Sequence, residues 1–151
     1  MKLLRNLFNK KPPTPKPDDQ RKFYLIEVKT WGQYAENAKE VQSHHCRDNW
    51  QDAEYSKERK TYHYGWLDSI PCKFVPEPNN KYDKNAILVV IEGLPVGYVP
   101  KTNNKNVLKF AKKYPHGVAE IHGGDRKYKD EYGDIIKETD TPIIEAKLFI
   151  E

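Results

Sequence analysis

Apolar residues recur along the chain in short runs, many of them alternating with polar residues, which is typical of half-buried β-strands. The run 86–91 is continuously apolar and predicts a buried strand. Glu92 and Gly93 follow it as a turn, so we expect the segment 95–99 to return as its hairpin partner. Further short strands are expected at 23–30, 61–66, 72–75, 118–122 and 144–150.

The clearest helical pattern lies between residues 103 and 114. Its apolar and aromatic residues follow the i, i+3, i+4, i+7 spacing of one helix face: Val107, Phe110, Ala111 and Tyr114. Residues 31–60 are polar and have no Gly or Pro after position 32, which predicts one or two helices on the surface. Residues 125–141 look like a polar excursion. We therefore expect a mainly β fold, a small barrel or sandwich with one clear helix after the central hairpin.

Composition and charge divide the chain into a tail and one domain. The 151 residues suit a single domain, and ten Tyr, five Phe and three Trp compensate for a hydrophobic share of only 37%. Residues 1–22 hold seven basic and two acidic side chains and four prolines, so we expect an extended basic tail before a domain at 23–151. The apolar residues of 3–8 give this tail a second interpretation, as a short peptide that docks on a protein partner or a membrane surface.

Several classes of protein are disfavoured by what the sequence lacks. It has no apolar run of the roughly 18 residues that span a membrane. Two cysteines are too few for a disulfide scaffold, so we expect a cytoplasmic location. Neither a phosphate-binding loop nor a serine-nucleophile elbow is present. His44, His45 and Cys46 have no second segment with ligand spacing, and we therefore expect no catalysis, metal or cofactor.

The most informative segment is 76–87, which leads directly into the buried run. Its two further prolines and its asparagines specify a rigid loop that presents Asn80, Tyr82 and Asp83. Tyr82 is an aromatic surface beside polar groups, an arrangement that suits a nucleotide base. The alternative is that Asp83 and the asparagines only cap the turn.

This segment and the hairpin after it resemble the HIRAN domain. The family pattern is roughly R-E-P-x-N-P-Y-D-x-N-A-I, a variable strand and turn, and then I-G-Y-L-P. The chain carries it as Glu77-Pro78-Asn79-Asn80-Lys81-Tyr82-Asp83-Lys84-Asn85-Ala86-Ile87, then Gly93, then Val96-Gly97-Tyr98-Val99-Pro100. Pro76 stands where the family has Arg, Lys81 where it has Pro, and residues 31–60 have no counterpart.

The resemblance implies an OB-like β-barrel that binds DNA. In DNA-repair ATPases that remodel replication forks, this domain captures the 3′ end of single-stranded DNA between aromatic rings. Carried over, Asn80 is the motif asparagine, Tyr82 stacks on the terminal base and Asp83 contacts the 3′ hydroxyl. Lys101 would contact a phosphate. The second stacking aromatic would be Tyr62 or Tyr64, where Thr61 or His63 replaces the family's preceding Arg.

The charge pattern after the motif agrees with a nucleic-acid partner. No acidic residue lies between Glu92 and Glu120, whereas Lys101, Lys105, Lys109 and Lys112 are available for phosphates. We therefore expect a non-catalytic module that binds single-stranded DNA at 3′-hydroxyl ends, in DNA repair, replication or mobile-element DNA processing. Two alternatives remain: a protein-interaction module, suggested by nine acidic against five basic residues in 120–151, and a metal-dependent nuclease.

Overall fold

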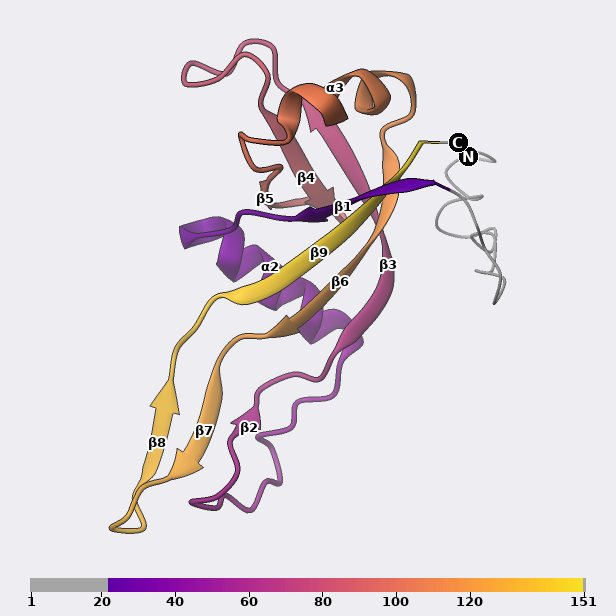
Figure 1. Ribbon diagram of the computed structural model, residues 1–151. Coiled ribbons are helices and arrows are strands. Elements are labelled where there is room, and N and C mark those ends of the chain that lie inside the picture. The colour runs from indigo at the N-terminus through magenta and orange to yellow at the C-terminus, as the bar shows by residue number, and fades with distance from the viewer. Residues whose placement is uncertain (1–21, 151) are drawn as a thin grey trace.

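The computed structural model describes residues 22–150, so the expected tail lies outside the described residues apart from Lys22. The described chain is mainly β, as the alternating pattern predicts (Figure 1). Its elements are β1 (Phe23–Glu27), α2 (Gly32–His45), β2 (Thr61–Tyr62), β3 (Leu67–Pro76), β4 (Ile87–Ile91), β5 (Leu94–Tyr98), α3 (Asn104–Lys113), β6 (His116–Gly123), β7 (Arg126–Lys129), β8 (Ile135–Glu138) and β9 (Pro142–Phe149).

Six strands form one strongly curled antiparallel sheet in the order β1-β9-β6-β3-β4-β5. Its two edges meet just beyond β1: the Lys29 amide donates to the Tyr98 carbonyl at 2.8 Å, and the Tyr98 amide donates back at 2.9 Å. Gly97 permits this approach, because a Cβ there would lie 2.3 Å from the Lys29 carbonyl oxygen. The sheet is therefore a half-barrel joined at a single bridge.

The core fills the concave side of this sheet. Ile87, Val89 and Ile91 of β4 are fully buried, which confirms the buried strand expected at 86–91. At one end of the barrel α3 buries Val107 and Ala111, and its bounds agree with the expected helix. Pro71 is tolerated inside β3 because β4 pairs with that strand only from Lys73 onward, so no ladder bond is lost on that side.

The segment 31–60 differs from the expected pair of surface helices. Only α2 forms, and it is part of the core, since Ala38 and Val41 are fully buried. Residues 46–60 are irregular and are held by side-chain hydrogen bonds. The Asp48 carboxylate accepts from the Trp50 amide at 2.9 Å, and the Trp50 indole donates to the Thr61 carbonyl at 2.9 Å.

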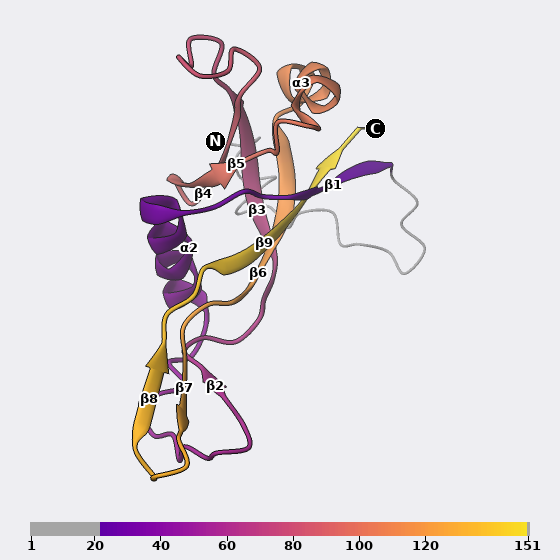
Figure 2. The same ribbon diagram turned by 60° about the vertical axis from the view of Figure 1, so that its left-hand side comes forward.

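The expected polar excursion contains a hairpin. Strands β2, β7 and β8 make a second, three-stranded sheet that extends beyond one end of the half-barrel (Figure 2). Asp130 closes its turn by accepting from the amides of Tyr132 and Asp134, both at 2.9 Å. We call this part of the molecule, residues 46–66 and 125–141, the extension. Across residues 22–150, neither helix is long and apolar enough to cross a membrane.

Candidate nucleic-acid interface

The loop 77–86 is fixed by its own side chains. Its ends are joined by a hydrogen bond from the Glu77 amide to the Ala86 carbonyl at 2.9 Å. Within it, the side-chain oxygen of Asn80 accepts from the amides of Tyr82 at 2.9 Å and Asp83 at 3.0 Å. Asn80 is therefore occupied in shaping the turn, and Tyr82 stands on a backbone that is held in place.

Tyr82 is the one aromatic residue of the loop, and 83% of its surface is accessible. The Lys81 ammonium lies 5.0 Å from its ring centroid, a cation–π distance. An aromatic ring that is this exposed on an ordered loop can stack on a planar ligand.

Asp83 connects the loop to α3. One carboxylate oxygen accepts from the Asn85 amide at 2.9 Å, and the other accepts from the Asn104 side-chain amide at 2.6 Å. The capping role weighed for Asp83 is thus present in the structure. These two hydrogen bonds, with the charges of Lys101 and Lys105, lower the pKa of the Asp83 carboxyl. An ionised carboxylate offers about four acceptor positions, so it can still accept from a ligand hydroxyl.

The expected lysines are partly gathered around Asp83. Lys101 and Lys105 are close enough for their charges to act on its carboxylate. Lys105, Lys109 and Lys112 are exposed residues of α3. This helix lies beside the loop 77–86, at the same end of the barrel (Figure 1). Lys109 is four residues beyond Lys105, about 6 Å along the helix axis. The helix therefore carries a line of positive charge that starts at the loop.

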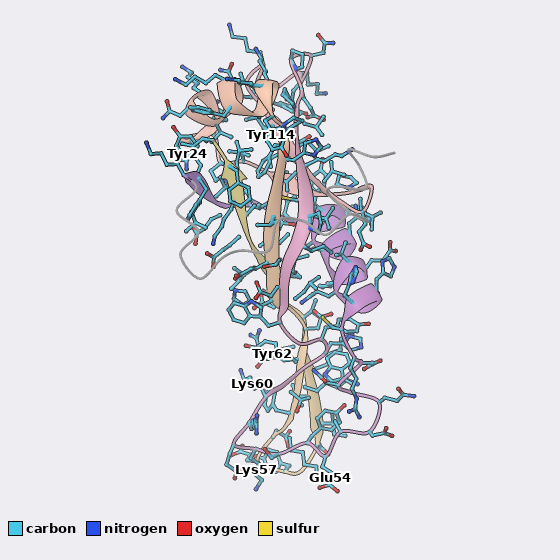
Figure 3. The ribbon with its side chains drawn as sticks, turned by 90° about the vertical axis from the view of Figure 1, so that its right-hand side faces the viewer. Tyr24, Glu54, Lys57, Lys60, Tyr62 and Tyr114 are labelled. Carbon is cyan, nitrogen blue, oxygen red and sulfur yellow. The ribbon has the colours of Figure 1, made fainter. Side chains whose placement is uncertain are left out.

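Tyr62 and Tyr64 are not brought to this loop, contrary to the expectation that one of them faces Tyr82. Both belong to the extension, where Figure 3 shows Tyr62. The ten residues of β3, about 33 Å of strand, separate them from the loop. Tyr64 stacks instead on His63, with ring centroids 4.1 Å apart, and the Arg126 guanidinium lies 5.9 Å from the Tyr62 ring.

Trp31 and Tyr98 are the aromatics that the fold does place near the loop. Their rings stack at 6.1 Å, and Trp31 is 50% exposed. The Tyr98 hydroxyl donates to a Glu77 carboxylate oxygen at 2.7 Å, and the same oxygen accepts from Asn80 at 3.1 Å. Burial, and then the bond to Glu77, raises the pKa of Tyr98, so its hydroxyl remains a donor. Trp31 was missed because nothing local shows that the segment just before it, at Lys29, meets β5.

The histidines singled out in the sequence contact a carboxylate. His45 lies 2.9 Å and His44 lies 3.6 Å from one Glu92 oxygen, which ties the end of α2 to the β4–β5 turn. The Cys46 thiol faces the Gly65 carbonyl instead, at 3.5 Å. Over the described range, no three His, Cys, Asp or Glu side chains are grouped so as to hold a metal ion.

The chain matches no protein-family model, no curated protein and no solved structure. The resemblance to the HIRAN domain therefore rests on the sequence motifs of the loop and hairpin alone. The structural basis for a function is the geometry of the loop 77–86, α3 and the Trp31–Tyr98 pair.

Proposed function

We propose that this protein is a non-catalytic, HIRAN-like module that binds single-stranded DNA through the loop 77–86. The observation that carries the proposal is that 83% of the Tyr82 surface is accessible, on a loop whose backbone is held in place by Asn80 and Asp83. A base stacks on the Tyr82 ring. The phosphates that follow it meet Lys101 and Lys105 first, and then Lys109 and Lys112 along α3.

The ionised Asp83 carboxylate supports selectivity for a strand end. An internal phosphate beside it would be repelled, whereas a terminal 3′ hydroxyl can donate a hydrogen bond to it. A 3′-phosphate would place like charges together, so the proposed ligand is a 3′-hydroxyl end. In place of Tyr62 or Tyr64, we assign the second aromatic surface to Trp31, which is exposed and linked to Asn80 through Tyr98 and Glu77.

Fluorescence anisotropy with labelled single strands tests this proposal. Strands that end in a 3′ hydroxyl should bind more tightly than strands with a 3′-phosphate or with the label blocking that end. Affinity should also fall steeply between two salt concentrations, because lysine–phosphate contacts release counterions. Binding that ignores both the strand end and the salt would contradict the proposal and favour a protein-interaction module.

The Tyr82→Ala variant tests the stacking step. Loss of one stacked base costs about 1–3 kcal/mol, or roughly 5- to 150-fold in affinity. Tyr132→Ala is the matched control, because Tyr132 is 81% exposed but lies on the extension. If both variants bind DNA as tightly as the unmodified protein, Tyr82 is not a stacking surface.

A further inference from the structure

The convex side of the sheet carries a row of carboxylates that runs across its strands. Glu27 on β1 is the cross-strand partner of Glu145 on β9, and Glu145 is the partner of Glu120 on β6. Asp68 on β3 continues the row next to Glu120. Like charges directly opposite one another destabilise a sheet. We call the surface formed by Leu25, Glu27, Val118, Glu120 and Glu145 the acidic face.

Within the described part of the chain, no ion pair neutralises this row. Among residues 22–150, no lysine or arginine forms an ion pair with Glu27, Glu120 or Glu145. Lys147 lies on the same face, between its cross-strand partners Leu25 and Val118, and its ammonium lies 4.7 Å from the Phe23 ring centroid. Burial, and then the neighbouring carboxylates of Asp68 and Glu145, raise the pKa of Glu120, as expected where negative charges crowd together.

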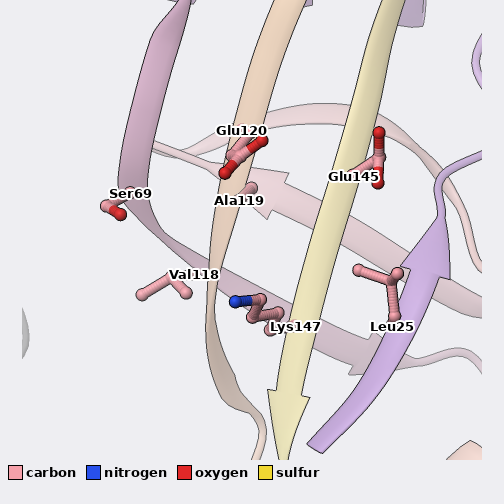
Figure 4. A pocket seen from close by; sticks show the side chains of 7 residues that line it. All are labelled: Leu25, Ser69, Val118, Ala119, Glu120, Glu145 and Lys147. Carbon is pink, nitrogen blue, oxygen red and sulfur yellow. The ribbon is translucent and has the colours of Figure 1, made fainter. Parts of the chain in front are cut away.

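Apolar groups accompany the charges. Leu25 is 55% exposed and, with Val118, lines a hollow of about 220 Å³ whose other walls include Glu120, Glu145 and Lys147 (Figure 4). Beyond it, Trp66 is 60% exposed and stacks one side of its indole on His122, 3.7 Å between centroids. The face thus offers a hollow with apolar and charged walls, carboxylates and an indole, which together suit a peptide that alternates aliphatic and basic side chains.

The chain itself contains such a peptide. The first eleven residues carry the aliphatic and aromatic side chains of Leu3, Leu4, Leu7 and Phe8 among four basic residues, Lys2, Arg5, Lys10 and Lys11, with no acidic residue. They are joined to the face through β1, the edge strand that carries Leu25 and Glu27. The 21 residues before Lys22 can span up to about 70 Å, whereas the eight residues of β9 span about 27 Å. Reach is therefore ample.

We propose that residues 1–11 dock in cis on the acidic face, with their aliphatic side chains in the hollow beside Leu25 and Val118 and their basic side chains on Glu27, Glu120 and Glu145. Tethering gives the segment an effective concentration on the order of millimolar, so modest contacts suffice to hold it. The docking is independent of the DNA-binding proposal, because it uses none of the residues of the loop 77–86.

Amide NMR spectra of the full chain test the docking by reciprocal changes. In the first variant, Glu27, Glu120 and Glu145 are each replaced by Gln, and the amide signals of residues 2–11 should shift. In the second, Lys2, Arg5, Lys10 and Lys11 are each replaced by Gln, and the amide signals of Leu25, Val118 and Glu145 should shift. The matched control replaces Glu54, Glu58 and Glu131, three exposed acidic residues of the extension, by Gln and should leave residues 2–11 unchanged.

The outcomes separate the possible occupants of the face. Shifts that are reciprocal and independent of protein concentration support docking in cis. Shifts that grow with concentration, together with a doubled mass in solution, would overturn it in favour of docking on a second copy. An absence of shifts at residues 2–11 in the Glu27, Glu120 and Glu145 variant would overturn it in favour of a separate partner. Because Gln is close to Glu in shape and removes repulsion, this variant is expected to fold.

Discussion

Replacing Gly97 by Ala should open the half-barrel at its single bridge. The new Cβ would lie 2.3 Å from the Lys29 carbonyl oxygen and 2.8 Å from a Val28 methyl carbon, and the oxygen belongs to backbone that cannot rotate away. Gly97 also has a φ of +151°, which side chains with a Cβ rarely adopt. The sheet edge must therefore move apart at this point.

Two contributions lower the free energy of unfolding in this variant: the strained backbone at position 97 and the lost hydrogen bonds of the bridge. The unfavourable backbone conformation costs about 1–3 kcal/mol. Loss of the two hydrogen bonds between Lys29 and Tyr98 costs about 0.5–1.5 kcal/mol each, for a total of about 2–6 kcal/mol. A loss of 1 kcal/mol lowers the melting temperature of a domain of this size by about 2–4 °C, so the decrease should be at least about 4 °C.

Two other glycines provide matched controls. Gly93→Ala introduces the strain alone, because its φ is +78° but nothing lies within 4 Å of the added Cβ. Gly65→Ala introduces neither strain nor contact. Urea unfolding should rank the losses as Gly97, then Gly93, then Gly65, and hydrogen exchange should show faster loss of protection at the Lys29 and Tyr98 amides than in β6. A Gly97→Ala protein no less stable than Gly93→Ala, with both amides protected, would refute the reasoning.

Three further outcomes are expected. Asp83→Asn should narrow the preference for a 3′-hydroxyl over a 3′-phosphate strand. Asn104→Ala removes the hydrogen bond from Asn104 to Asp83 but keeps the charge of Asp83, so it should retain this preference. The same ratio of the two affinities in both variants and in the unmodified protein would contradict the role of Asp83. A chain that starts at Gln20 should fold and melt within about 4 °C of the full chain, because cis docking adds about 1 kcal/mol at most. In that shorter chain, Glu120→Gln should raise stability at pH 7 by about 0.2–1 kcal/mol, because the raised pKa of Glu120 means that its ionisation disfavours the folded state. The gain should vanish below about pH 4, where Glu120 is protonated in both states.

The β4–β5 hairpin, α3 and β9 could be predicted because their signals are local. A continuous apolar run followed by Glu92 and Gly93 leaves few alternatives to a hairpin, and both turn residues have the positive φ that such a turn requires, 53° and 78°. In β9 the alternation is strict, and Ile144, Ala146 and Leu148 are all buried. Tertiary contacts only strengthened what these segments favour on their own.

The extension and the core role of α2 could not be predicted because their signals are not local. The β7–β8 hairpin is held by charged contacts such as Arg126 to Glu138 at 2.7 Å, so its strands lack an apolar alternation. In α2 the buried residues include Gln42, although a glutamine predicts a solvent-exposed position. The position of Tyr62 depends on where β3 begins. A proline at position 71 predicts the start of the strand there, but β3 begins four residues earlier, at Leu67.

The contacts of the loop also explain why sequence alone could not separate binding from folding at this site. Asn80 and Asp83, two polar residues of the motif, each hold the loop backbone, and Asp83 joins it to α3 through Asn104. On the other side, Glu77 joins it to Tyr98 and hence to Trp31.

A ligand that binds here would meet groups already oriented by the fold, which reduces the ordering cost of binding. Because these side chains also hold the loop backbone, replacing Asn80 or Asp83 by Ala would disturb the loop itself. Binding roles are therefore to be tested with Tyr82→Ala, whose side chain makes no hydrogen bond in the described structure, and with the isosteric Asp83→Asn.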